Sequence, residues 1–268
     1  MMMAFFKKQT EKDSAEGFRS KRRAILSSES HFSVKEAYKT LRTNIRFSLP
    51  EGKCHKVGVT SGLPNEGKSI TALNIAITFA EAGQRVLLID ADLRRPSVAR
   101  LLIENGDPGL SNLLAGMCKV EDVIHKNQYP NLDVILSGAI PPNPSELLSS
   151  PRMAKLLEDF TGQYDYIFVD TPPVNVVTDA SVLAPELDGM LFVVRQNQSE
   201  RESVARAISQ LNRAGAKILG FVLNGAKLAS GKKYARARKG YYMFEFYGYD
   251  PKTDEGVRIM NAKPSKKK

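Results

Sequence analysis

Short runs of almost wholly apolar residues recur along this chain of 268 residues, and they limit its possible folds more than any other feature. The runs with β-type composition lie at 57–60, 86–89, 132–136, 166–169, 190–194 and 218–223. Segments with helical spacing of apolar residues lie between most of them. Strands that are apolar on both sides need helices on both faces of their sheet. The pattern predicts an α/β fold with a doubly wound, mostly parallel sheet.

The expected helices and the chain ends complete this outline. Helices are predicted at 34–48, 68–82, 151–161 and 199–214, with shorter pieces near 96–104, 110–125 and 178–185. Ser33 and Glu36 match a capping box at the start of the first helix. Because the alternation stops after Gly225, we expect a single domain with mobile tails. The predicted parts are a flexible leader (1–30), the domain (31–226) and a basic, tyrosine-rich tail (227–268).

Composition excludes several classes of protein. Hydrophobic residues make up 42% and charged residues 25%, which excludes wholesale disorder. The longest uncharged stretches, 69–80 and 134–145, have twelve residues, whereas a membrane span needs about 18 or more. The apolar run before Lys7 is too short for a signal peptide. Two lone cysteines, Cys54 and Cys118, suit a reducing compartment, so we expect a cytoplasmic protein.

The net charge of +10 is concentrated at the two ends. Residues 1–30 carry 7 basic and 4 acidic side chains, and residues 225–268 carry 12 basic and 4 acidic ones. The remaining 20 basic and 21 acidic side chains leave the body nearly neutral. Basic ends on a neutral body favour contact with a phosphate, an acidic partner or an anionic membrane surface, although solvated charged tails are also common.

A phosphate-binding loop is predicted between the strand that ends near Thr60 and the following helix. Residues 62–69 read Gly-Leu-Pro-Asn-Glu-Gly-Lys-Ser, which matches GxxxxGK[ST]. The backbone N–H groups of such a loop and the positive end of the helix surround phosphates. Lys68 would reach the β- and γ-phosphates, and the Ser69 hydroxyl would hold Mg²⁺. The predicted nucleotide-binding residues are Gly62, Pro64, Asn65, Glu66, Gly67, Lys68, Ser69, Ile70 and Asn224.

Carboxylates end two of the apolar strands. Asp90 and Asp92 follow one of them, and Asp170 follows another. The carboxyl ends of parallel strands share one edge of the sheet, where ligands of such folds bind. Carboxylates there can hold Mg²⁺ or accept a proton from a hydroxyl, although a strand-end aspartate can also be a simple cap. Together with Lys68 they are the predicted catalytic residues, and with Ser69 they are the predicted metal site.

The nucleotide base is expected to be adenine. Guanine recognition usually uses an NKxD pattern, and the segment from Asn224 to Lys227 reads Asn-Gly-Ala-Lys. The poor match favours ATP over GTP. Asn224 would contact the base through its amide or would only turn the chain after the last strand.

These motifs resemble those of the bacterial tyrosine kinases (BY-kinases) of capsule and exopolysaccharide operons, over about residues 33–249. The similarity lies in the phosphate-binding loop, in Asp90 and Asp92 followed by Leu-Arg-Arg-Pro at 93–96, and in Asp-Thr-Pro-Pro at 170–173. The resemblance implies that Asp90, Asp92 and Asp170 serve Mg²⁺ and the tyrosine hydroxyl. It leaves open which aspartate is the base.

Related ATPases of the MinD/ParA type share this branch of P-loop folds and are the alternative. Their loop carries a signature lysine just after the first glycine, where this chain has Leu63. The kinase family also has an assembly helix with an ExxRxxR pattern, matched here by Glu36, Lys39 and Arg42. Lysine keeps the charge of the first arginine but lacks its planar fork, so the subunit number stays open.

The tail carries the expected phosphorylation sites, Tyr234, Tyr241, Tyr242, Tyr247 and Tyr249. The resemblance implies that they are autophosphorylated in trans, because the tyrosine cluster of the family occupies this place. Other possibilities are a terminal segment that docks its aromatic residues on the body, or a tail that binds single-stranded nucleic acid. A third is a regulatory tail that is only bound.

The resemblance therefore implies a protein-tyrosine kinase that controls polysaccharide synthesis or export. Its implied partners are a membrane-bound activator with a cytoplasmic segment, further copies of itself and proteins of polysaccharide synthesis. We expect a peripheral location at the inner face of the cell membrane and no binding of nucleic acid. A positioning ATPase without kinase activity is the alternative.

Overall fold

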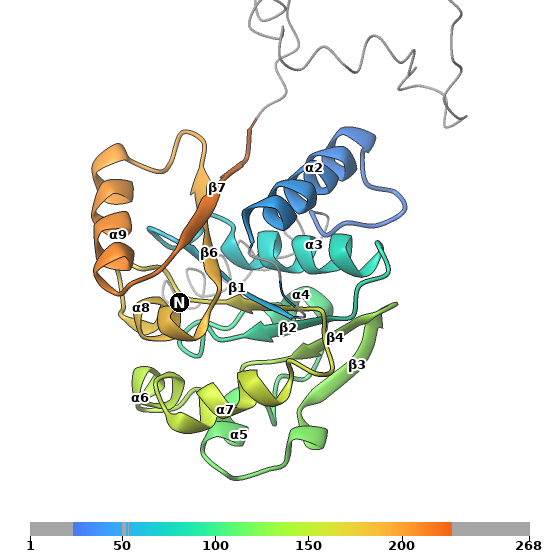
Figure 1. Cartoon of the computed structure of the whole chain (residues 1–268), viewed down its shortest axis with the longest axis vertical. Coiled ribbons are helices and arrows are strands. Elements are labelled where there is room, and N and C mark those ends of the chain that lie inside the picture. The colour runs from blue at the N-terminus through green and yellow to red at the C-terminus, as the bar shows by residue number, and fades with distance from the viewer. Residues whose placement is uncertain (1–23, 50–51, 53, 227–268) are drawn as a thin grey trace, which may run out of the picture. The chain divides into compact units, whose positions relative to one another are not determined.

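The computed structural model describes residues 24–49, 52 and 54–226, and its centre is a seven-stranded sheet (Figure 1). The strand order is β3-β4-β2-β5-β1-β6-β7. All neighbours are parallel except β3, which runs antiparallel to β4. The strands are β1 (His55–Ser61), β2 (Val86–Asp90), β3 (Ile124–Tyr129), β4 (Leu132–Ile135), β5 (Tyr166–Asp170), β6 (Gly189–Arg195) and β7 (Ile218–Asn224). The predicted α/β fold is confirmed.

Helices cover both faces of this sheet (Figure 1). The longer ones are α2 (Phe32–Ser48), α3 (Lys68–Ala80), α7 (Pro151–Asp159) and α9 (Arg201–Arg213). The short ones are α4 (Val98–Leu102), α5 (Leu110–Leu114), α6 (Pro144–Leu148) and α8 (Asp179–Leu183), with single 3₁₀ turns at Val120–Asp122 and Ala184–Glu186. No described helix has the length and apolar character that a membrane crossing requires.

Alternate residues of one strand divide between two hydrophobic cores. In β2, Val86 and Leu88 pack in the core with α3, whereas Leu87 and Ile89 pack in the core with α5 and α7. All four side chains are fully buried. This division explains why the strands are apolar without alternation, since neither face of the sheet meets water.

Helix α3 is enclosed between the sheet and α2. Almost every residue of α3 is buried, because α2 covers the side that the sheet leaves free (Figure 1). Arg42 of α2 donates from Nη1 to the carbonyl oxygen of Thr78 at 2.7 Å. The segment before α2 also packs here: Leu26 is buried and its N–H donates to Asn74 of α3. Residues 24–30 therefore belong to the domain rather than to the leader predicted for 1–30.

Two other local predictions differ from the structure. The helix expected near 110–125 is only α5 and a 3₁₀ turn, and β3 begins at Ile124. This edge strand is half exposed and joins β4 through Pro130 and Asn131, so it lacks the apolar run by which the other strands are recognised. The capping box of Ser33 and Glu36 is absent, because α2 starts at Phe32, two residues earlier than predicted, and the His31 side chain accepts the Ser33 N–H.

Candidate nucleotide-binding and phosphoryl-transfer site

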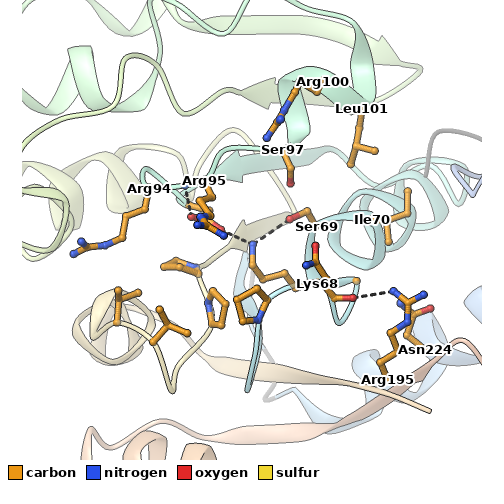
Figure 2. A pocket seen from close by; sticks show the side chains of 18 of the residues that line it. Lys68, Ser69, Ile70, Arg94, Arg95, Ser97, Arg100, Leu101, Arg195 and Asn224 are labelled. Carbon is orange, nitrogen blue, oxygen red and sulfur yellow. Dashed lines mark hydrogen bonds and ion pairs between the residues drawn. The ribbon is translucent and has the colours of Figure 1, made fainter. Parts of the chain in front are cut away.

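The loop after β1 and the start of α3 form one end of a pocket of about 630 Å³ (Figure 2). Gly67 caps α3 in the left-handed region with φ +96°, which favours glycine. The next residues, Lys68 and Ser69, turn their side chains toward the pocket. The first turn of α3 therefore presents free N–H groups and the positive end of its dipole to this space, which suits a phosphate.

Asn224, the last residue of β7, contacts the phosphate-binding loop. Its amide nitrogen donates to the carbonyl oxygen of Glu66 at 2.9 Å. A Cβ added to Gly67 would lie 1.8 Å from the same nitrogen, so Asn224 occupies the space that a side chain there would need. Asn224 thus joins the end of β7 to the loop and also lines the pocket.

The last residue of β6 and the segment that follows it hold the loop in place. Arg195 donates from Nη1 to the carbonyl oxygen of Asn65 at 2.8 Å. The Glu66 carboxylate accepts hydrogen bonds from the Leu63 N–H, at 2.8 Å, and from the Ser199 hydroxyl. The Glu66 side chain is buried in these contacts and does not line the pocket, so its role is to hold the loop in shape.

The three predicted aspartates converge beside Lys68. Asp90 and Asp170 are register partners at the ends of β2 and β5. The ammonium of Lys68 lies 2.7 Å from Oδ2 of Asp92 and 3.6 Å from Oδ1 of Asp170. It also donates to the Ser69 hydroxyl at 3.2 Å. The positive charge of Lys68 thus offsets the negative charge of these carboxylates, at the position where the sequence predicts bound phosphates.

Burial and mutual repulsion shift the protonation of these groups. Burial and then the Asp170 charge raise the pKa of Asp90 to about 7. Burial also raises the pKa of Asp170 to about 6, against the opposing charge of Lys68. For Lys68, burial acts to lower the pKa, but Asp170 and Asp92 outweigh it and raise the pKa. Lys68 therefore stays a cation in this site, while Asp90 and Asp170 lose their protons at a higher pH than an ordinary carboxyl group.

The donor set fits Mg²⁺ together with a nucleotide. Both carboxylate oxygens of Asp170 are buried without a hydrogen-bond partner, and Lys68 is the charge beside them. Within the described residues no three His, Cys, Asp or Glu side chains form a metal cage. Protein-bound Mg²⁺ usually takes one or two carboxylates, phosphate oxygens and water rather than such a cage. Ser69, Asp90, Asp92 and Asp170 remain the residues that would hold it.

An arginine-rich segment after β2 lines the opposite side of the pocket (Figure 2). Arg94 pairs with the buried carboxylate of Asp179 at 2.8 Å. Arg95 and Arg100 also line the pocket and are exposed. From the sequence, Arg94 and Arg95 were noted only as part of the Leu-Arg-Arg-Pro segment, with no assigned role. Arg195 was not predicted as a site residue, because Asn65, which it contacts, lies 130 positions away in the sequence.

The structure brings most of the predicted site residues together. Those that line the pocket are Pro64, Asn65, Gly67, Lys68, Ser69, Ile70, Asp92 and Asn224. Gly62, Glu66, Asp90 and Asp170 are outside this lining. Glu36 and Lys39 of the predicted assembly helix form an ion pair at 2.7 Å. The five tail tyrosines lie outside the described residues.

This combination of a strand, a glycine-capped phosphate loop and carboxylates at the neighbouring strand ends defines a P-loop nucleotide-binding protein. The family model of an AAA domain matches residues 65–215. The tyrosine-protein kinase YwqD of Bacillus subtilis is 39% identical over 226 residues, 84% of this chain and 93% of YwqD. The chain therefore belongs to the bacterial tyrosine-protein kinases.

Solved structures agree with this assignment. The kinase domain of Escherichia coli tyrosine kinase ETK matches with a TM-score of 0.71 and 38% identity, over 74% of this chain and 78% of that domain. MinD of Pyrococcus horikoshii, solved with Mg-ADP, matches with a TM-score of 0.55 and 24% identity, over 69% of this chain and 76% of MinD. The likeness to MinD shows the fold alone. The predicted protein-tyrosine kinase is confirmed, and the positioning ATPase is the weaker alternative.

Relatives of this kinase differ in length. The tyrosine-protein kinase ptk of Acinetobacter johnsonii is 35% identical over 195 residues, which are 73% of this chain but 27% of ptk. The same domain thus occurs in chains about as long as this one and within longer chains.

Proposed function

We propose that this kinase transfers the γ-phosphoryl group of ATP to the tyrosines of its own C-terminal tail, acting between copies. The supporting observation is the convergence of Lys68, Asp92 and Asp170 at the mouth of the phosphate loop. The tail tyrosines are Tyr234, Tyr241, Tyr242, Tyr247 and Tyr249. A chain that provides both the active site and a tyrosine-rich segment needs only a second copy as substrate.

Binding of ATP rearranges the contact between Lys68 and Asp92. Lys68 and Asp92 form a buried ion pair at 2.7 Å, in which each group offsets the charge of the other. When Lys68 turns to the β- and γ-phosphates, Oδ2 of Asp92 loses its partner and becomes a free proton acceptor. Asp92 lines the pocket, whereas the Asp90 carboxylate accepts the N–H groups of Asp92 and Val98, at 3.2 and 3.1 Å. This favours Asp92 as the residue that meets the tyrosine hydroxyl.

The transfer itself is a displacement at phosphorus. The tyrosine oxygen forms a bond to the γ-phosphorus, and the bond from that phosphorus to the bridging oxygen of ADP breaks. The hydroxyl proton passes to the carboxylate. Lys68, the loop N–H groups and the start of α3 stabilise the negative charge on the phosphoryl oxygens and on ADP.

Mg²⁺ fits the same site and would be held by Ser69, Asp90, Asp92 and Asp170. When bound, it supplies positive charge to the phosphate oxygens. Its requirement is testable by chelation, because removal of Mg²⁺ should abolish labelling of the tail.

Two complementary variants test transfer between copies. Lys68→Met keeps the tail tyrosines but lacks the phosphate-binding lysine, and the fivefold Tyr→Phe variant keeps the site but lacks the acceptors. Mixed with ATP, they should place phosphate on the Lys68→Met chains. Each variant alone should incorporate none. Labelling of the wild type without labelling of the mixture would contradict transfer between copies, and no labelling of any sample would contradict the assigned activity.

The cellular setting extends the same proposal. The kinase acts at the inner face of the cell membrane as an oligomer, with a membrane-bound activator, and phosphorylates proteins of capsular or exopolysaccharide synthesis. Support comes from the resemblance of the motifs and from the partial match of Glu36, Lys39 and Arg42 to the ExxRxxR pattern. Further support comes from relatives such as ptk, in which a domain similar to this chain is part of a longer protein. Co-purification of the kinase with membranes, with and without the activator, tests this setting.

A further inference from the structure

The pocket has a basic wall and an apolar wall on either side of Lys68. Arg95, Ser97 and Arg100 line it from the segment after β2. Pro172, Pro173, Val176 and Val177 line it from the segment after β5. Val176 is 56% exposed although it is apolar. An acceptor that approaches Lys68 and Asp92 must pass between these walls.

The arginines that line the pocket differ in their engagement. Arg94 is held by Asp179, Arg195 by the carbonyl of Asn65, and Arg100 by the carbonyl of Pro96, to which its Nη2 donates at 2.7 Å. The guanidinium of Arg95 has no hydrogen-bond or ion-pair partner in the part of the chain that the structure describes, and it is exposed. An exposed, unengaged cation beside an exposed apolar surface suits a substrate segment that is both acidic and aromatic.

The tail contains one segment that is acidic and aromatic and another that is strongly basic. Residues 240–250 carry six aromatic side chains, the acids Glu245 and Asp250, and no basic residue. Residues 232–239 surround Tyr234 with Lys232, Lys233, Arg236, Arg238 and Lys239. Positive charge near Arg95 and Arg100 attracts the first segment and repels the second.

We propose that Arg95 and Arg100 select acceptor tyrosines with acidic neighbours, so that Tyr247 and Tyr249 of a second copy are phosphorylated before Tyr234. Val176 and the two prolines contact the aromatic residues that flank the acceptor. The inference rests on the proposed kinase function. It assigns the basic wall to the protein substrate rather than to ATP.

Peptide kinetics test the selection. The enzyme is the full chain with its five tail tyrosines changed to Phe, so that only added peptide accepts phosphate. With the peptide of residues 240–250 as substrate, Glu245→Gln with Asp250→Asn should raise KM about three- to tenfold, because two exposed charge pairs with the enzyme are lost. High salt should remove most of this difference. A peptide of residues 231–239 should be the poorest substrate.

Variants of the enzyme assign the effect to the basic wall. Arg95→Gln with Arg100→Gln should raise KM for the peptide of residues 240–250 and leave KM for ATP unchanged. Arg206→Gln, an exposed arginine of α9 outside the pocket, is the matched control. Charge reversal, Arg95→Glu with Arg100→Glu, should recover activity on a peptide that carries Glu245→Lys and Asp250→Lys.

The outcomes separate this inference from the kinase assignment. If KM for the peptide does not change when Glu245 and Asp250 are neutralised, or if the arginine variants raise only KM for ATP, the proposed role of the arginines is wrong. The assignment as a tyrosine kinase would not be affected by either result. Absence of phosphate on every peptide and on the wild-type tail would overturn both.

Discussion

Asp90 and Asp170 lie side by side as register partners at the ends of the parallel strands β2 and β5, and both are fully buried. Two carboxylates at this position are costly for the folded protein, because burial and mutual repulsion disfavour their charged forms. Lys68 offsets part of the cost. The fold thus concentrates negative charge where the function requires it, at some expense of stability.

The first prediction concerns pH. The pKa of Asp90 is about 7 and that of Asp170 about 6 in the folded protein, above the ordinary value of 3.8. Between about pH 4 and pH 7 the folded state therefore binds more protons than the unfolded state, so the free energy of unfolding falls as pH rises. Asp90→Asn should reduce this pH-dependent loss of unfolding free energy between pH 5 and pH 8 by about 2–3 kcal/mol.

Urea unfolding at the two pH values measures this loss. Asp159→Asn, which removes an exposed carboxylate from α7, is the matched control. An unchanged difference in the Asp90→Asn variant would show that Asp90 is ionised throughout this range. Tyrosine phosphorylation in the same variant should fall sharply.

The second prediction concerns the buried cation. Lys68→Met leaves Asp92 and Asp170 without their positive partner and should lower the free energy of unfolding by about 3 kcal/mol at pH 8. At pH 5 the loss should be smaller, because protonation of Asp170 removes one of the buried negative charges. Lys155→Met breaks an exposed ion pair with Asp159 and should cost less than about 1 kcal/mol. Equal losses for the two variants would contradict the buried role of Lys68.

The local features of the site could be predicted from sequence because each lies within a short segment. The loop of residues 62–69 has a fixed spacing, and Asp90, Asp92 and Asp170 directly follow apolar strands. A parallel sheet brings such strand ends to one edge regardless of loop details. The convergence of these acids on Lys68 therefore followed from the fold class.

Contacts between distant segments could not be predicted in this way. The link from Asn224 to Glu66 spans 158 positions, and the pairing of Arg94 with Asp179 spans 85. Neither has a sequence pattern of its own. The edge strand β3 was missed for a different reason, because its half-exposed residues alternate too weakly to distinguish a strand from a helix.

The third prediction concerns Gly67. Gly67→Ala should lower the free energy of unfolding by about 2 kcal/mol, from the left-handed backbone and from loss of the hydrogen bond between Asn224 and Glu66. Gly83→Ala is the control, since Gly83 also has a positive φ, +82°, but nothing lies within 4 Å of an added Cβ. Gly83→Ala should therefore lose only the unfolding free energy that an alanine costs at a positive φ.

A second substitution separates the two contributions. Asn224→Ala in the Gly67→Ala protein removes the clash, so the two losses should be less than additive. Fully additive losses would show that Asn224 does not occupy the space above Gly67. ATP binding, measured by calorimetry, should be weakened in both Gly67 variants.

The central claim is that the pocket transfers phosphate to tail tyrosines rather than to water alone. Intact-mass spectrometry of the purified chain after incubation with ATP and Mg²⁺ tests it most directly. The account predicts successive mass increases of one phosphoryl group in the wild type, and none in Lys68→Met or in the fivefold Tyr→Phe variant. Hydrolysis of ATP by the wild type with no change in its mass, before or after addition of a membrane-bound activator, would contradict it.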